Sequence, residues 1–435
     1  MNRRVIGIGI SLAVVALTAS LGVVAQQATA ACKLKAPVSP TTINVFGFRF
    51  PMMEYYFNAA EACGKVQNIT VNTSFLQAAQ YETQVNTALA VGSSPYQILH
   101  INPRLAADWG NKGWLVPLNV LIARYKTQYD LSDMSDSLLA NTTVKGRAYG
   151  LPVNFNTQIQ FYRKDIFSEL GLKPARNVEE LSTLLESLKK AGKTKYPFAL
   201  ALGGGGLVGE FHNNFAALGG SWFDNNRIPT FNSATGVKAA QALFDWLEYM
   251  PPSVLTYTND DLMVGLQQGD IALSKIWLTR ASAMEDEKVS KVVGKIEFAP
   301  AFKFVANGFG ANTAEGDALA IPTTNKVDVD LVFRVMMEML GKSNQTNAAN
   351  FGMVSRDSIA TNPTFIAKNR AWVAAAGNAR QAVPLRPLVA YQSIANTIVG
   401  NELRLAFVNK TSIKVALDTA AKKVTDEMRV QKFIK

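Results

Sequence analysis

Residues 42–48, TINVFGF, begin a run of alternating elements that decides the fold of this chain. β-Branched and aromatic residues dominate this stretch, which favours a strand. A helical pattern over 51–63 leads to a second β-rich run, NITVNTSF at 68–75. Another helical pattern over 78–91 leads to a third, YQILHI at 96–101. Strand, helix, strand, helix, strand predicts a doubly wound α/β lobe.

A second lobe is predicted further along the chain. From Asn141, turn residues, a proline and two β-type runs precede a helix start, and we expect the chain to pass between lobes here. The run YPFALAL at 196–202 then opens a second α/β lobe. A chain of this length exceeds one typical core. We expect two lobes, one formed by 31–150 with 305–345 and the other by 151–304 with 346–435, with crossings near 149–156, 300–310 and 341–352.

The N-terminus has the layout of a secretory signal peptide. Arg3 and Arg4 precede an uncharged stretch over 5–25, and Ala28 and Ala30 supply a cleavage site before Ala31. This predicts a signal peptide over 1–30 and a mature protein in the periplasm. Because the uncharged stretch approaches the length that spans a bilayer, an uncleaved anchor is the alternative.

The two cysteines of the chain are Cys32 and Cys63. Export places them in an oxidising compartment, where two thiols most simply form one disulfide. The alternative is lipidation of Cys32 as the first mature residue, although Thr29 stands where such sites usually place a large aliphatic residue.

Charge and motifs exclude several function classes. The net charge is +11, or +9 without Arg3 and Arg4, and the basic residues form no dense run, which argues against nucleic-acid binding. The chain has two histidines, His100 and His212, and no HExxH, paired CxxC or GxSxG motif. It therefore lacks the catalytic motifs of the familiar zinc and serine hydrolases. We expect no cofactor, no metal and no catalysis. A glycosidase using two carboxylates, for instance from Glu54, Glu82 and Glu210, stays open.

The loop LGGGGLVGEFHNN at 202–214 places Gly204, Gly206 and Gly209 at the spacing of a dinucleotide fingerprint. That fingerprint also requires an acidic residue at the end of the following strand. Asp224 lies at a suitable distance but within GGSWFDNN, which reads as a turn. The context therefore argues against a nucleotide site.

Several segments in order resemble the bacterial extracellular solute-binding proteins of the maltose-binding type, the capture subunits of ATP-driven importers. The similarity covers nearly all of the mature chain. The segments are KGRAYGLP with FYRKDIFSELGL, LGGSWFDNN, LQQGDIALSKIWLTRASA, EGDALAIP, VPLRPLVAYQSIANTIVG and VALDTAAKKVTDEM. The resemblance implies two lobes that close on a solute in the cleft between them, a membrane permease as partner, and a monomer.

The resemblance also implies which residues face the cleft. A sugar offers hydroxyls at its rim and C–H groups on its faces, which suits polar side chains beside aromatic rings. The implied ligand-binding residues are Phe48, Arg49, Gln77, Asn102, Asn154, Glu210, Phe211, His212, Trp277, Arg386 and Tyr391.

Each assignment has a structural alternative. Phe48 and Trp277 can fill a core, Arg49 can be a surface charge, and Arg386, set between two prolines, can form a structural salt bridge. Whether Trp222 contacts a ligand stays open. The aromatic residues favour a neutral mono- or oligosaccharide, while the arginines and the positive net charge leave a polyol, an acidic sugar or a glycerophospho compound as alternatives.

Overall fold

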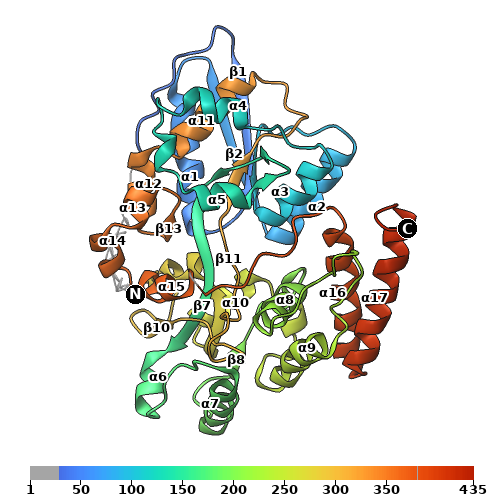
Figure 1. Ribbon diagram of the computed structural model, residues 1–435. Coiled ribbons are helices and arrows are strands. Elements are labelled where there is room, and N and C mark those ends of the chain that lie inside the picture. Colours follow the sequence, from blue (N-terminus) through green and yellow to red (C-terminus); the bar gives the residue numbers. More distant parts are fainter. Residues whose placement is uncertain (1–28, 380) are drawn as a thin grey trace, which may run out of the picture.

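The computed structural model describes residues 29–379 and 381–435 and has two α/β lobes, drawn one above the other in Figure 1. The long strand β7 (Asn154–Arg163) runs from the upper lobe into the lower one. The predicted signal peptide lies, up to residue 28, outside the described residues. Within the described ranges, no helix is long and apolar enough to cross a bilayer.

The first lobe is built on a five-stranded sheet in the order β2-β1-β3-β12-β6. β1 pairs in parallel with both β2 and β3, whereas β12 runs antiparallel to β3 and β6. The helices α1 and α2 connect the three parallel strands, which confirms the predicted alternation of strands and helices. The bounds are β1 (Thr41–Phe48), α1 (Pro51–Glu61), β2 (Ile69–Leu76), α2 (Ala78–Ala90), β3 (Ile98–Ile101), β6 (Leu151–Pro152) and β12 (Ala318–Ala320).

The second lobe is built on strands in the order β10-β7-β9-β8. Side chains of a strand alternate between its two faces, so the polar residues Asn156, Gln158 and Gln160 share one face of β7 while Ile159 and Phe161 enter the core on the other. The bounds are β8 (Tyr196–Ala199), β9 (Ile271–Trp277) and β10 (Ile296–Ala299).

Helices surround both sheets (Figure 1). The first lobe has α3 (Pro103–Asn111), α4 (Asn119–Tyr125), α5 (Asp136–Asn141), α11 (Val329–Met339) and α12 (Lys342–Ala348). The second has α6 (Lys164–Glu169), α7 (Val178–Ala191), α8 (Gly206–Ala217), α9 (Ala234–Trp246), α10 (Asn259–Gln267), α16 (Gln392–Asn409) and α17 (Ile413–Val430). Three helices, α13 (Asp357–Ala360), α14 (Pro363–Lys368) and α15 (Arg370–Ala379), lead from one lobe to the other.

The lobes are connected around the first half of β7. β6 precedes β7 directly, while β11 (Ala314–Glu315) and β13 (Met353–Val354) both pair with β7. Asn154 Nδ2 donates to Asp317 Oδ2 (3.0 Å), and the Asp317 amide donates to Asn154 Oδ1 (2.8 Å), which joins two crossings. The hinge therefore lies where these short strands meet β7. The exact division of the chain between the lobes stays a prediction.

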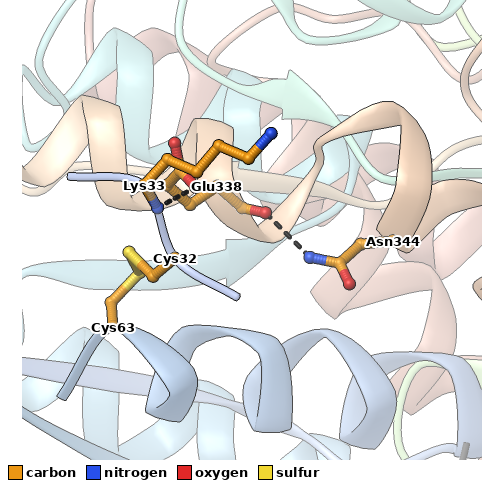
Figure 2. The surroundings of a disulfide bond; sticks show 5 residues. All are labelled: Cys32, Lys33, Cys63, Glu338 and Asn344. Carbon is orange, nitrogen blue, oxygen red and sulfur yellow. Dashed lines mark hydrogen bonds between the residues drawn. A yellow bond between two sulfur atoms is a disulfide. The ribbon is translucent and has the colours of Figure 1, made fainter. Parts of the chain in front are cut away.

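A disulfide fastens the N-terminal segment to the first lobe (Figure 2). Cys32 and Cys63 have Cα atoms 4.9 Å apart, and Cys63 follows α1. The Lys33 amide donates to Glu338 Oε2 on α11 (2.9 Å), and Asn344 Nδ2 donates to the Glu338 carbonyl (2.9 Å). Closing a loop of this length stabilises the folded state by about 3 to 4 kcal/mol on the chain-entropy account.

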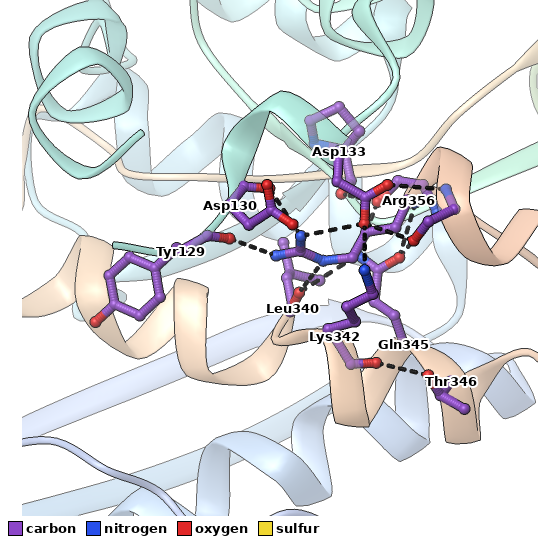
Figure 3. A network of polar contacts seen from close by, with 11 residues as sticks. Tyr129, Asp130, Asp133, Leu340, Lys342, Gln345, Thr346 and Arg356 are labelled. Carbon is purple, nitrogen blue, oxygen red and sulfur yellow. Dashed lines mark hydrogen bonds and ion pairs between the residues drawn. The ribbon is translucent and has the colours of Figure 1, made fainter. Parts of the chain in front are cut away.

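A buried arginine organises the polar contacts near the third crossing (Figure 3). Arg356 is 1% exposed and donates from Nη1 to the Asp130 carbonyl (2.9 Å), from Nη2 to the Tyr129 carbonyl (2.9 Å) and from Nε to the Leu340 carbonyl (3.2 Å). Asp133 Oδ2 lies 3.7 Å from Nη1. One side chain thus connects the segment after β13 to the loop after α4 and to the end of α11.

Candidate functional site: the cleft between the lobes

A cleft of about 1290 Å³ lies between the two lobes. Its first wall comes from the residues after β1 and β3 and from α2 and α3. This agrees with the rule that sites in α/β sheets form outside the carboxyl ends of the strands. The second wall comes from β7, β9, α8 and α10, and residues 385–401 complete the lining.

The structure brings eight of the eleven predicted ligand residues to this cleft. They are Phe48, Arg49, Gln77, Asn102, Glu210, His212, Trp277 and Arg386. Some already have intramolecular partners. Arg49 pairs with Glu54 (3.0 Å) and its side chain is 61% exposed, while Asn102 Oδ1 accepts from the Leu105 amide and caps α3 (2.9 Å).

The other three predicted residues lie elsewhere. Asn154 is buried in the hinge against Asp317. Phe211 is fully buried and packs against Phe215 and Trp222 in the core of the second lobe. Tyr391 packs edge-on against Phe223, with the ring centroids 4.9 Å apart. Phe211 and Tyr391 each adjoin a residue that lines the cleft, but neighbouring residues of a helix point in different directions. Asn154 lies at the start of β7, where its pairing with Asp317 turns it into the hinge.

The glycine loop at 203–206 borders the cleft and begins α8. A Cβ on Gly203 would lie 2.5 Å from the Thr256 carbonyl oxygen, and one on Gly206 would lie 2.0 Å from that of Ala201. Gly204 has a positive φ of +52°. Close packing of backbone against backbone therefore explains Gly203 and Gly206, and the positive φ explains Gly204.

The wall of the cleft on the second lobe is a buried polar network. Thr313 Oγ1 donates to Asn213 Oδ1 (2.6 Å), and Asn213 Nδ2 donates to Gln158 Oε1 (2.7 Å). Gln158 Nε2 then donates to Glu210 Oε1 (2.8 Å), whose Oε2 lies 2.6 Å from Lys275 Nζ. Burial lowers the pKa of Lys275, and the neighbouring Glu210 opposes this effect. Glu210 is thus a structural partner of Lys275 at the cleft wall.

His212 holds the segment that carries Arg386. The Trp222 indole N–H donates to His212 Nδ1 (3.0 Å), so the hydrogen of the neutral ring is on Nε2 and is donated to the Pro384 carbonyl (2.9 Å). Burial, and then the nearby Arg386, lower the pKa of His212 to about 3. The ring is therefore neutral at physiological pH.

Arg386 faces charges of the first lobe and of the hinge strand β11. Its Nη1 donates to Asn396 Oδ1 (3.3 Å), and Arg104, Glu315 and Glu82 act on it electrostatically. Burial, and then Arg104, lower the pKa of Arg386 to about 10. Burial, and then the neighbouring Asp317, raise the pKa of Glu315 to about 7.

Sequence reasoning missed many residues that line the cleft, among them Phe50, Asp260, Arg280 and Asp317. The sequence signal that could have identified Arg280 is its place shortly after Trp277 in the segment SKIWLTRASA. Asp260 lies in the first turn of α10, and only the packing of α10 beside β9 brings it near Arg280.

The pKa of His212 predicts a pH dependence of stability. A histidine that is neutral when folded and has an ordinary pKa of 6.5 when unfolded stabilises the fold fully above 6.5, and this contribution falls as the pH drops toward 3. Between pH 7 and pH 4.5, wild type should lose about 2 to 3 kcal/mol more than His212→Gln, which keeps an N–H donor but does not titrate. Urea denaturation at both pH values measures the difference.

Glu315 titrates in the opposite sense, since its raised pKa costs stability as the pH rises from 4.5 to 7, but it is present in both proteins and cancels in the comparison. Equal pH slopes in the two proteins would show that His212 is not held neutral.

Among residues 29–379 and 381–435, no cluster of three or more His, Cys, Asp or Glu side chains is placed to hold a metal ion. What the cleft offers instead is a set of hydrogen-bond donors and acceptors beside the aromatic residues Phe48, Phe50 and Trp277. That arrangement suits the enclosure of a small hydroxylated molecule.

Known proteins share this sequence pattern and fold. A mannitol-binding protein of Pseudomonas aeruginosa is 29% identical over 251 residues, 56% of this chain and 56% of that protein. The chain thus matches little more than half the length of this relative. A solute-binding protein of an ABC transporter from Agrobacterium radiobacter K84, solved with ribitol, has a TM-score of 0.80 at 20% identity and covers 90% of this chain and 99% of its own.

A solute-binding protein of Agrobacterium vitis S4, solved with D-mannitol, has a TM-score of 0.79 at 22% identity, with 90% of this chain and 99% of its own covered. Both solved structures show that the two-lobed architecture is shared. The family model of the bacterial extracellular solute-binding proteins matches residues 53–331. This match begins within α1 and ends within α11, covers more than half of the chain, and shows that the chain belongs to the bacterial extracellular solute-binding protein family.

Proposed function

We propose that the protein captures a small neutral polyol or sugar in the cleft between its lobes and delivers it to the membrane permease of an ABC importer. The observation that carries this proposal is the composition of the cleft. Its lining has seven Lys or Arg and seven Asp or Glu side chains, so the formal charges of the wall balance and an anion gains little net attraction from the wall as a whole, even though Glu315 is only partly charged at pH 7. Polar groups beside aromatic rings match hydroxyls beside C–H groups.

The relatives support this choice of ligand. The Pseudomonas protein is named for mannitol, and the two Agrobacterium structures hold ribitol and D-mannitol. Charge balance and these names together favour a polyol or neutral sugar over the acidic sugar and glycerophospho alternatives. Binding without turnover also fits a family of binding proteins.

Within this proposal, the two lobes close on the solute by bending at the strands around β7. Trp277 and Phe48 supply ring faces, while Arg386 and the amides of Gln77 and Asn102 supply polar contacts. The signal peptide is removed near Ala31, and the mature protein acts in the periplasm as a monomer.

A melting experiment tests the function. We expect D-mannitol, ribitol or maltose to raise the melting temperature, because a ligand at a hundredfold excess over its Kd stabilises the folded state by about 3 kcal/mol. Solution scattering at saturation should show a smaller radius of gyration, and chromatography should recover the ligand unchanged.

The control compounds are D-mannonate and glycerol 3-phosphate. A shift caused by these anions alone would reject the neutral ligand class, and cleavage or conversion of a bound compound would reject a pure binding role. If no compound on the panel shifts the melting temperature, solute capture of this class is wrong.

A further inference from the structure

Arg280 is the most deeply buried of the described arginines that line the cleft, with 6% of its surface exposed. It follows β9 in a short helical turn, on the wall that belongs to the second lobe. A buried arginine that lines a binding cleft needs hydrogen-bond acceptors for its five N–H groups.

The protein satisfies these donors only in part. Arg280 Nη1 donates to Thr279 Oγ1 at 3.2 Å, and Nη2 donates to Asp260 Oδ1 at 3.3 Å, both longer than the usual charge-assisted bond. Within the described residues, Nε has no hydrogen-bond partner. Nε is itself buried, but Nη1 and Nη2 each use only one of their two N–H groups in the bonds above, so the guanidinium group keeps donor capacity toward the cleft that it lines.

Carboxylates and a ring complete the surroundings of Arg280. The Asp260 side chain is 22% exposed and lines the cleft, so it retains accepting capacity there. Asp317 also acts on Arg280, although its own carboxylate is engaged by Asn154 (3.0 Å) and lies 3.1 Å from His100 Nε2. From the first lobe, the ring of Phe50 lies under the guanidinium group, with its centroid 5.2 Å from Cζ.

We propose that Arg280 and Asp260 form a diol-binding subsite, in which the guanidinium group donates to, and the carboxylate accepts from, two neighbouring hydroxyls of the solute. The inference rests on the proposed function and adds the part of the ligand that this end of the cleft recognises. Phe50 of the first lobe packs against Arg280 of the second lobe here. A solute bound by Arg280 and Asp260 therefore lies against both lobes. Two carboxylates face one guanidinium group, and the subsite therefore disfavours an acidic group on the ligand.

The first test compares Arg280→Gln with wild type by calorimetric titration of D-mannitol and ribitol. Losing a buried charge-assisted bond should weaken binding by about 10- to 100-fold. The matched control is Arg370→Gln, because Arg370 also lies over a phenylalanine, Phe298, and pairs with two carboxylates, Glu285 and Glu297, but does not line the cleft. The control should bind like wild type.

A second variant guards against misfolding of the first. Asp260→Asn keeps the shape of the side chain and removes its charge, and it should weaken binding by about 10-fold or more while the unliganded protein melts near wild type. Unliganded melting curves of every variant separate lost binding from lost folding.

The ligand supplies the final test. The probes are deoxy-D-mannitols that each lack one hydroxyl. Wild type should bind at least one of these analogues at least 10-fold more weakly than D-mannitol. Arg280→Gln should bind that analogue and D-mannitol with equal affinity. If Arg280→Gln and Asp260→Asn both bind a polyol as tightly as wild type does, the subsite proposal is wrong and the proposed function stands. If wild type binds nothing on the panel, the proposed function itself fails before any variant is compared.

Discussion

Replacement of Arg356 by alanine should lower the free energy of unfolding by about 3 to 5 kcal/mol. Arg356 is 1% exposed, and its loss leaves the Tyr129 carbonyl without its donor. The Asp130 and Leu340 carbonyls lose their bonds to the guanidinium group and keep only the longer ones from the Asp133 amide (3.2 Å) and Gln345 Nε2 (3.5 Å). Unpaired buried acceptors cost about 1 to 3 kcal/mol each before the surroundings relax. Urea denaturation followed by circular dichroism measures the change.

Two further variants make this prediction specific. Arg356→Lys keeps the charge but cannot reach three carbonyls with a planar group, so it should recover little of the stability. Arg124→Ala removes an arginine that is 56% exposed and pairs with Asp330 (2.8 Å), and it should cost less than about 1 kcal/mol. Equal losses in Arg356→Ala and Arg124→Ala would contradict a structural role for the Arg356 contacts in Figure 3.

Replacement of Glu210 by glutamine should also cost about 3 to 5 kcal/mol, because it leaves the ammonium group of Lys275 buried without a counter-charge. The Lys275 side chain is 1% exposed and that of Glu210 is 4% exposed. Without the carboxylate, burial alone acts on Lys275 and lowers its pKa further. The folded variant then binds fewer protons than its unfolded chain, so its stability should rise with pH toward 10. Denaturation at pH 7 and pH 9 measures both effects.

The double variant Glu210→Gln/Lys275→Met should regain most of this stability, since no buried charge remains. As a control, Asp426→Asn breaks the exposed pair with Lys422, whose side chain is 79% exposed, and should change stability by less than about 0.5 kcal/mol. A double variant less stable than Glu210→Gln would show that Lys275 stabilises the fold through its bond to the Ala311 carbonyl and not chiefly through Glu210.

Much of the cleft could be predicted because it forms at strand ends. Phe48 ends β1, Asn102 follows β3 and Trp277 ends β9, and all three line the cleft. Strand ends can be read from local patterns of β-branched and turn residues. Whether the lining residues bind a solute stays a prediction that the titrations above decide.

Prediction was weaker on helices and in the hinge. Glu210 lines the cleft while the adjacent Phe211 is buried against Trp222, and Asn154 binds Asp317, 163 positions away. Direction around a helix depends on a rotation of about 100° per residue, so an error of one position moves a side chain from the cleft to the core.

By itself, the sequence determined the α/β class, the order of the strands and helices of the first lobe, and the candidate cysteine pair. These follow from short-range periodicity and from residue types, which act within a few positions of the chain. Only the tertiary structure decided that Arg280 pairs with Asp260, that His212 donates to the Pro384 carbonyl, and that Glu210 pairs with Lys275. Such pairs form when helices and strands distant in sequence pack side by side, and burial then makes each polar group depend on the partner that packing supplies.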